Sequence, residues 1–76
     1  MDLNKFIENF SAQFDMTDPS SFTAETIYKN LDEWSSLIAL SVIAMVDEEY
    51  GASIKGDDIR STDTIRQLFD IVKARL

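Results

Sequence analysis

The sequence feature that most constrains the fold is a run of ten residues, Leu37 to Val46, in which only Ser41 is polar. No proline or glycine interrupts the chain between Leu37 and Tyr50, and Gly51 follows where a left-handed C-terminal cap is favoured. The run is too short to span a bilayer. It therefore predicts one long helix over residues 36–50.

The N-terminal segment predicts a helix over residues 2–14, because its large apolar side chains recur every three or four positions and Asp2 suits the positive end of a helix. Residues 15–35 predict a long connection, with a turn signal in "TDPSS" and room for one helical turn. Four apolar residues are expected to pin this connection: Phe22, Ile27, Tyr28 and Leu31.

The C-terminal part of the chain predicts a short and a longer helix. Residues 55–61 have room for one short turn of helix. Thr64 and Gln67 are spaced as a capping box, and apolar residues then recur at helical intervals to Leu76. With no period-two strand pattern, the sequence predicts an all-α fold, a small helical bundle of three or four helices depending on the short turn, formed by residues 1–76 as one domain. The residues expected in its core are Phe6, Phe10, Val42, Val46, Tyr50, Ile54, Ile59, Ile65, Phe69 and Val72.

The charge balance limits the kinds of partner. The chain has 14 acidic and 7 basic residues, which gives a net charge of −7. Because phosphate backbones and anionic membranes repel such a chain, we expect no nucleic acid and no membrane partner, and we favour basic protein surfaces. The N-terminal segment lacks the basic and then apolar layout of a signal peptide, so a cytoplasmic protein is expected.

The residue types exclude most hydrolytic chemistry. Without cysteine there is no disulfide, thiolate nucleophile or Cys-based zinc site, and without histidine the commonest general base and metal ligand are both absent. We therefore expect that the chain is not itself an enzyme and holds no metal.

The predicted helix over residues 36–50 has two different sides, since each residue turns the helix by about 100°. One side is apolar and makes a suitable core face. The opposite side places Leu37 and Leu40 upstream of two acids, Asp47 and Glu48. Two interpretations remain open: other segments cover the leucines, or the leucines form a partner surface with an apolar centre and an acidic rim.

Two adjacent serines, Ser35 and Ser36, stand at the start of this helix. Either could be the N-cap, because a serine hydroxyl accepts a hydrogen bond from a first-turn N–H. Neither has what a nucleophilic serine needs, since the chain lacks a histidine base and a glycine-rich nucleophile elbow. The remaining chemical role is an attachment point at which another protein supplies the chemistry.

This segment resembles the acyl carrier protein family, whose hallmark is Asp-Ser-Leu at the start of the second helix. Ser35-Ser36-Leu37 stands at that place and is followed by "IALSVIAMVDEEYG". The resemblance extends through the acidic "GDDI" stretch and the closing helix, and so covers nearly the whole chain. It implies a four-helix bundle of acyl-carrier type, with a long first loop and a short third helix, and a 4′-phosphopantetheine arm esterified to Ser36.

The same resemblance implies a mechanism and a set of partners. A phosphopantetheinyl transferase with bound Mg²⁺ directs the Ser36 hydroxyl at the pyrophosphate of coenzyme A, which makes a phosphoprotein whose arm thiol holds acyl groups as thioesters. The partners are then this transferase, a ketosynthase and other acyl-processing enzymes with basic surfaces, in fatty acid, polyketide or related biosynthesis. The chain itself is expected to be a monomer. The residues expected to contact these partners are Leu37, Leu40, Asp47, Glu48, Asp57 and Asp58.

Two positions depart from the family pattern. Ser35 replaces the aspartate that normally precedes the modified serine, which removes a charge next to the attachment site, and Ser41 stands where the family often has an acid. The alternative function is a small helical protein–protein interaction module, in which a patch of Trp34, Leu37 and Leu40 binds one partner without a prosthetic arm.

Overall fold

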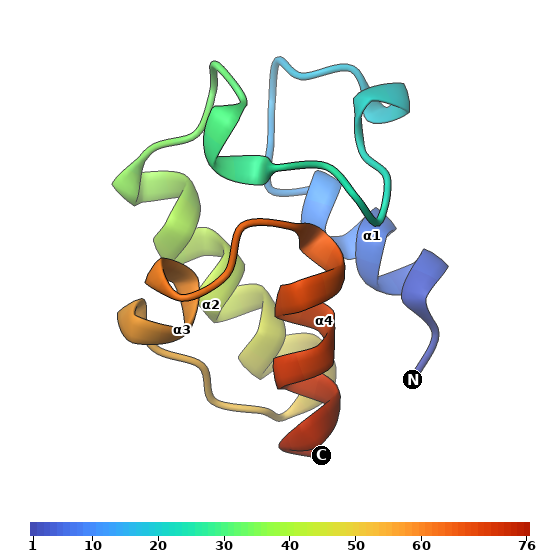
Figure 1. Cartoon of the computed structure of the whole chain (residues 1–76), viewed down its shortest axis with the longest axis vertical. Coiled ribbons are helices and arrows are strands. Elements are labelled where there is room, and N and C mark those ends of the chain that lie inside the picture. The colour runs from blue at the N-terminus through green and yellow to red at the C-terminus, as the bar shows by residue number, and fades with distance from the viewer.

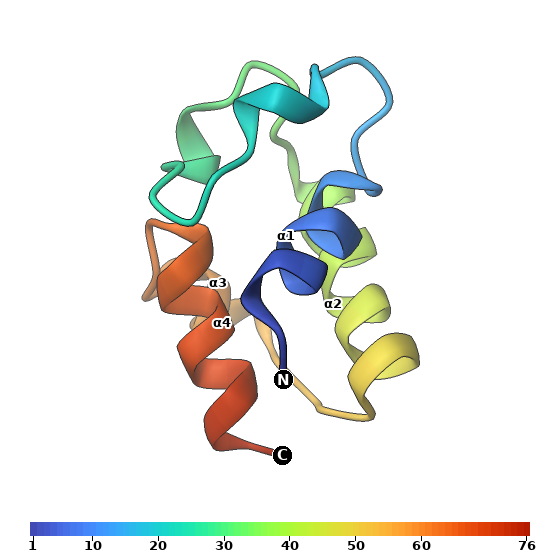
Figure 2. The same ribbon diagram turned by 90° about the vertical axis from the view of Figure 1, so that its right-hand side faces the viewer.

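Four α-helices and no strands make up a small helical bundle in the computed structural model, which describes residues 1–76 (Figure 1). Two short 3-10 turns, η1 and η2, interrupt the connection between the first two helices. Both chain ends lie at one end of the bundle, and the connection arches over the other end, where α2 and α4 begin (Figures 1 and 2). The elements are α1 (Leu3–Ser11), η1 (Pro19–Ser21), η2 (Tyr28–Asn30), α2 (Ser36–Tyr50), α3 (Gly56–Arg60) and α4 (Ile65–Ala74).

Helix α1 is shorter than the predicted span of residues 2–14. Asp2 is its N-cap, and its carboxylate accepts a hydrogen bond from a first-turn N–H. After Ser11 the chain tightens into turns, because Phe14 must turn away from the helix to reach Phe22, whose ring centre lies 4.9 Å from its own. Contact between aromatic rings, rather than local propensity, therefore ends the helix.

Helices α2 and α4 begin and end near the predicted positions. Gly51 is the C-cap of α2 with a φ of 65°, a left-handed conformation that glycine adopts without steric cost. Thr64 and Gln67 form the predicted capping box at the start of α4. The predicted periodicity to Leu76 is wrong at its end, since α4 stops at Ala74 and Leu76 is exposed.

The connection from residue 15 to residue 35 contains two 3-10 turns, where the sequence predicted one helical turn. Its middle is fixed to the start of α4 by an isolated antiparallel bridge between Ile27 and Thr64. Phe22 and Tyr28 of the connection are buried and pin it, as expected, whereas Ile27 is 46% exposed. The connection is therefore packed as part of the domain.

Aromatic residues from α1, the connection and α4 form much of the core. The ring centre of Phe6 lies 5.5 Å from that of Phe69 on α4. The ring centre of Phe10 lies 5.5 Å from that of Tyr28 in the connection. Every predicted core residue is buried except Tyr50, which is half-buried and whose hydroxyl accepts a hydrogen bond from the Asn9 side chain, 2.9 Å away. The core also contains residues that were not predicted in it: Phe14, Phe22, Tyr28, Met45, Ala52 and Leu68.

Candidate functional site

The two serines at the start of α2 have different surroundings. Ser35 is the N-cap, and its Oγ accepts a hydrogen bond from the backbone N–H of Ile38 at 3.3 Å. Ser36 is the first residue of the helix and is exposed, and its hydroxyl forms no hydrogen bond within the chain. Because Ser35 meets the capping requirement, the Ser36 hydroxyl is available to react.

Trp34 fixes the segment that leads into the serines. Its indole packs against the ring of Tyr28 with centres 4.9 Å apart, and it stacks on Phe14 at 6.4 Å. Such aromatic contacts add to the stabilisation from burial. The head of α2 is thereby held against the core through the residue next to the cap.

Glu33 ties the same segment to the chain that follows α1. Its carboxylate accepts hydrogen bonds from the backbone N–H of Asp15 at 2.7 Å, the N–H of Met16 at 2.9 Å and the hydroxyl of Thr17 at 2.8 Å. Loss of hydration raises the pKa of Glu33, but these hydrogen bonds to the charged form outweigh it and leave the pKa below its ordinary value. An ionised Glu33 therefore holds two loop segments together near the serines.

The apolar residues after Ser36 are exposed. Leu37 is 74% exposed and Leu40 is 62% exposed. The interpretation in which the connection or α1 covers them is therefore wrong. Residues three or four positions apart share one face of a helix. Leu37 and Leu40 therefore lie on the same face of α2 as Ala44 and the acids at its end.

The four acids predicted to contact partners differ in whether they form ion pairs within the chain. Asp47 and Glu48 are exposed at the end of α2, and their carboxylates make no ion pair within the chain. Asp57, on α3, is exposed and pairs with Arg60. Asp47 and Glu48 are therefore the acids most available to a partner.

Asp58 is occupied inside the chain. Its two carboxylate oxygens accept hydrogen bonds from Arg75 at 2.6 and 2.7 Å, and one of them also accepts from the backbone N–H of Lys55 at 2.8 Å. The Arg75 guanidinium is the main cause that keeps the pKa of Asp58 below its ordinary value. Since its side chain is only 14% exposed, Asp58 chiefly joins α3 to the end of α4.

A groove of about 390 Å³ lies beside Ser36, between η2, the first half of α2 and α3. Trp34, Leu40, Ile43 and Ile59 give it an apolar lining. Lys29 and Arg60 also line it, and sequence reasoning missed both. No local spacing could have found them, because only the tertiary fold brings η2 and α3 together.

The structure contains no group of three or more Asp or Glu side chains arranged to hold a metal ion. None of its helices has the length and apolar character needed to cross a membrane. No family model, curated protein or solved structure matches the chain.

Proposed function

We propose that the chain is an acyl carrier protein that holds acyl intermediates on a 4′-phosphopantetheine arm attached to Ser36, in cytoplasmic fatty acid, polyketide or related biosynthesis. Its helical bundle, with a long first loop and a short third helix, is then of acyl-carrier type. One observation carries the proposal: an exposed serine hydroxyl without a hydrogen-bond partner stands at the head of α2, beside a second serine that does the capping.

The site fits an arm that another protein attaches. Ser36 is accessible from solvent, but the chain has no histidine to remove its proton, so a transferase must supply the base together with Mg²⁺ and coenzyme A. The arm, once attached, supplies a thiol that carries acyl groups as thioesters. What this chain contributes is the hydroxyl, its position on a rigid helix end, and the surface around it.

That surface suits brief encounters with basic enzymes. Leu37 and Leu40 give an exposed apolar centre, and Asp47 and Glu48 lie on the same helix. Opposite charges on two partners mainly speed association and orient it, which favours exchange among several enzymes over one tight complex. We therefore propose the transferase, a ketosynthase and related acyl-processing enzymes as partners.

Intact mass tests the proposal. The unmodified protein is incubated with a promiscuous phosphopantetheinyl transferase, coenzyme A and Mg²⁺, and we expect its mass to rise by that of one arm. Ser36→Ala is expected to keep its original mass, and Ser35→Ala serves as the matched control that retains the hydroxyl at position 36. An unchanged mass of the parent protein under forcing conditions would refute the carrier function.

A second candidate is a helical interaction module without an arm. The exposure of Leu37 and Leu40 favours it, because isolated exposed apolar residues are common but adjacent ones on one helix face often mark a contact surface. It predicts that Ser36→Ala binds its partner normally, whereas Leu40→Asp does not.

A further inference from the structure

The groove beside Ser36 has an unusual charge for this chain. None of the 14 acidic residues lines it, but two of the 7 basic residues do, Lys29 and Arg60. The other two hollows on the surface are both lined by carboxylates, including Glu33 in one and Glu48 in the other. In a protein of net charge −7, this local reversal makes the groove favourable for an anion.

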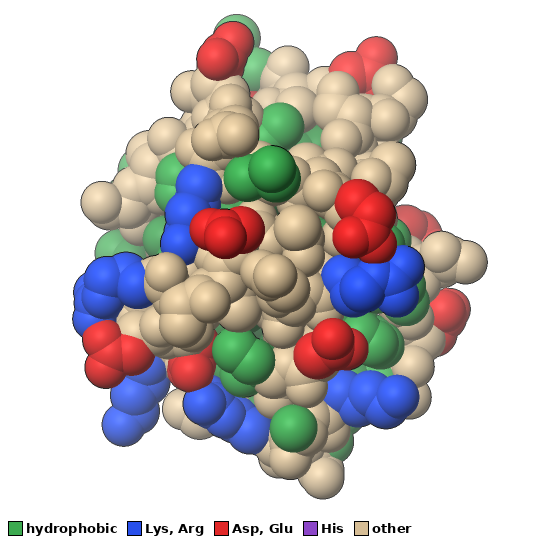
Figure 3. Space-filling view, viewed as in Figure 1, with side chains coloured by type: hydrophobic (Ala, Val, Ile, Leu, Met, Phe, Trp, Pro, Cys, Tyr) green, Lys and Arg blue, Asp and Glu red, His purple; other side chains and the backbone are tan.

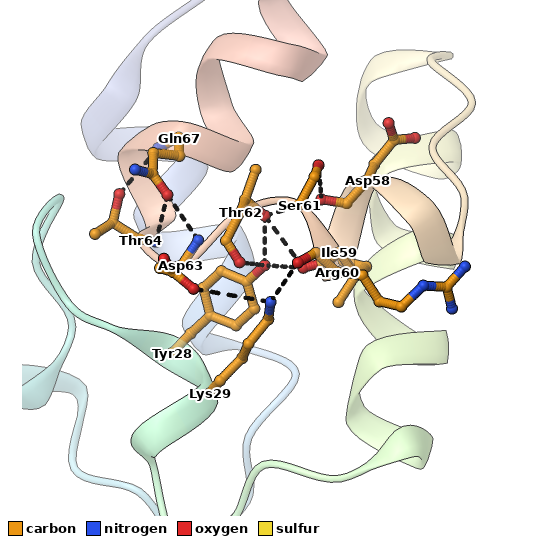
Figure 4. A network of polar contacts seen from close by, with 10 residues as sticks. All are labelled: Tyr28, Lys29, Asp58, Ile59, Arg60, Ser61, Thr62, Asp63, Thr64 and Gln67. Atoms are coloured by element: carbon orange, nitrogen blue, oxygen red, sulfur yellow. Dashed lines mark hydrogen bonds and ion pairs between the residues drawn. The ribbon is translucent and has the colours of Figure 1, made fainter.

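Lys29 is held in place by contacts with its neighbours (Figure 4). Its Nζ donates a hydrogen bond to the carbonyl oxygen of Arg60 at 3.0 Å and lies 5.9 Å from the centre of the Tyr28 ring. Asp63 is its nearest carboxylate, at 3.9 Å, and is largely exposed. Because an ammonium has three donors, this arrangement orients Lys29 without using all of them.

Arg60 brings the second cation to the same groove from the last position of α3. Its guanidinium lies over Gly56, where an added Cβ would come within 3.3 Å of it, and it pairs with Asp57. That pair is exposed on both sides, so its net stabilisation is small and it can exchange for another anion. In the view of Figure 3, Lys and Arg side chains lie on both the α3 side and the α4 side, with Asp or Glu side chains among them.

We propose that Lys29 and Arg60 bind the phosphate group carried by Ser36, which is the phosphodiester of the attached arm. This inference rests on the proposed function, because only a modified Ser36 carries a phosphate. Two cations on the groove side attract the phosphodiester, so the arm lies toward α3 and away from the acids at the end of α2. Lys29 and Arg60 are positioning residues for the arm.

The first experiment uses the arm-bearing protein. The double variant Lys29→Gln, Arg60→Gln keeps hydrogen-bond donors and removes both charges, and Arg66→Gln, Lys73→Gln removes one arginine and one lysine that do not line the groove. We expect the ³¹P chemical shift of the arm to differ from that of the parent protein in the first variant and to equal it in the second. Identical ³¹P signals in all three proteins would overturn the inference while leaving the proposed function intact.

The second experiment does not depend on the arm. Phosphoserine is incorporated at position 36, and its second pKa, about 6 in a free peptide, is measured by ³¹P titration. Nearby cations favour the dianion, so we expect removal of Lys29 and Arg60 charge to raise this pKa by about half a unit or more, and the Arg66, Lys73 control to leave it unchanged. The α2 dipole acts equally in all three proteins and cancels.

The two experiments separate the two ways to fail. If no arm attaches to the parent protein, the proposed function fails, and a phosphoserine pKa that rises in Lys29→Gln, Arg60→Gln but not in the control would still show that the groove binds phosphate. If the arm attaches but its ³¹P signal does not respond to Lys29→Gln, Arg60→Gln, the inference about the arm fails alone. Circular dichroism of each variant shows whether the helices are retained.

Discussion

At the scale of single residues, the head of α2 divides two tasks between neighbouring hydroxyls. The Ser35 hydroxyl accepts a hydrogen bond from the backbone N–H of Ile38 in the first turn, and this contact stabilises the helix end. Ser36 follows at the first helical position, where its own hydroxyl is not needed by the backbone. The two serines should therefore respond differently to the same substitution.

Replacement of each serine by alanine separates capping from attachment. We expect Ser35→Ala to lower the free energy of unfolding by about 1 kcal/mol, a typical loss for an N-cap, and to leave attachment of the arm possible. Ser36→Ala should abolish attachment and change thermal stability little. Mass spectra after identical transferase treatment, beside melting curves, check both outcomes, and an arm lost with Ser35→Ala but kept with Ser36→Ala would show that the wrong serine was assigned.

At the scale of the element, α2 has a buried side and an exposed side. Val42, Met45 and Val46 are buried against the rest of the bundle, while Leu37 and Leu40 are exposed. The helix thus contributes to the core while Leu37 and Leu40 of its first turns stay outside it. Apolar side chains that the fold leaves exposed lower solubility unless they form a contact surface.

Truncation on each side of α2 tests this division. Val46→Ala removes two buried methyl groups, and we expect it to lower the free energy of unfolding by about 1 to 2 kcal/mol. Leu37→Ala removes a larger but exposed group and should cost clearly less. Urea unfolding of both variants measures the difference, and a greater loss with Leu37→Ala would mean that this leucine is buried in solution.

The acids at the end of α2 should govern encounter rates. Asp47→Lys with Glu48→Lys should slow arm attachment by the transferase at low salt, because rim charges act mainly on association. Helicity should be retained, since lysine near a helix C-terminus is favoured by the dipole. The matched control is Glu8→Lys with Asp70→Lys, which makes the same change in net charge on α1 and α4, and equal slowing by both pairs would mean that only net charge matters.

At the scale of the whole molecule, two carboxylates hold its less regular parts. Glu33 joins the start of the long connection to the head of α2, and Asp58 joins α3 to the end of α4 through Arg75. Each acts across a sequence separation that local structure does not bridge. Both have a pKa below the ordinary value, because hydrogen-bond donors stabilise the ionised form, despite an opposing effect of lost hydration.

These lowered pKa values predict acid sensitivity. A carboxyl whose pKa is lower in the folded chain stabilises the fold above its unfolded pKa, about 4, and this contribution is lost as pH falls through the folded pKa. Glu33→Gln should therefore be less stable than the parent at pH 7 and should lose less stability between pH 5 and pH 3. The free energy of unfolding is measured by urea unfolding across this pH range, with Glu8→Gln, whose carboxylate makes no hydrogen bond, as the control. An equal loss of stability in the parent and in Glu33→Gln would contradict the role of Glu33.

The sequence by itself determined the all-α class and most helix ends. Capping by Asp2, the capping box at Thr64 and the left-handed cap at Gly51 are local hydrogen-bond and backbone effects, so a few neighbouring residues specify them. The start of α2 was predicted on the same grounds. Only the structure assigned the cap to Ser35, because both hydroxyls satisfied the local pattern.

The tertiary structure decided where distant residues meet. It ended α1 early so that Phe14 could reach Phe22, used Asp58 as an internal partner of Arg75, and left Leu37 exposed. It also placed Lys29 in the groove beside Ser36. The physical reason is the same in each case: these contacts join residues whose separation along the chain carries no periodic signal, so their geometry follows from the packing of the whole core.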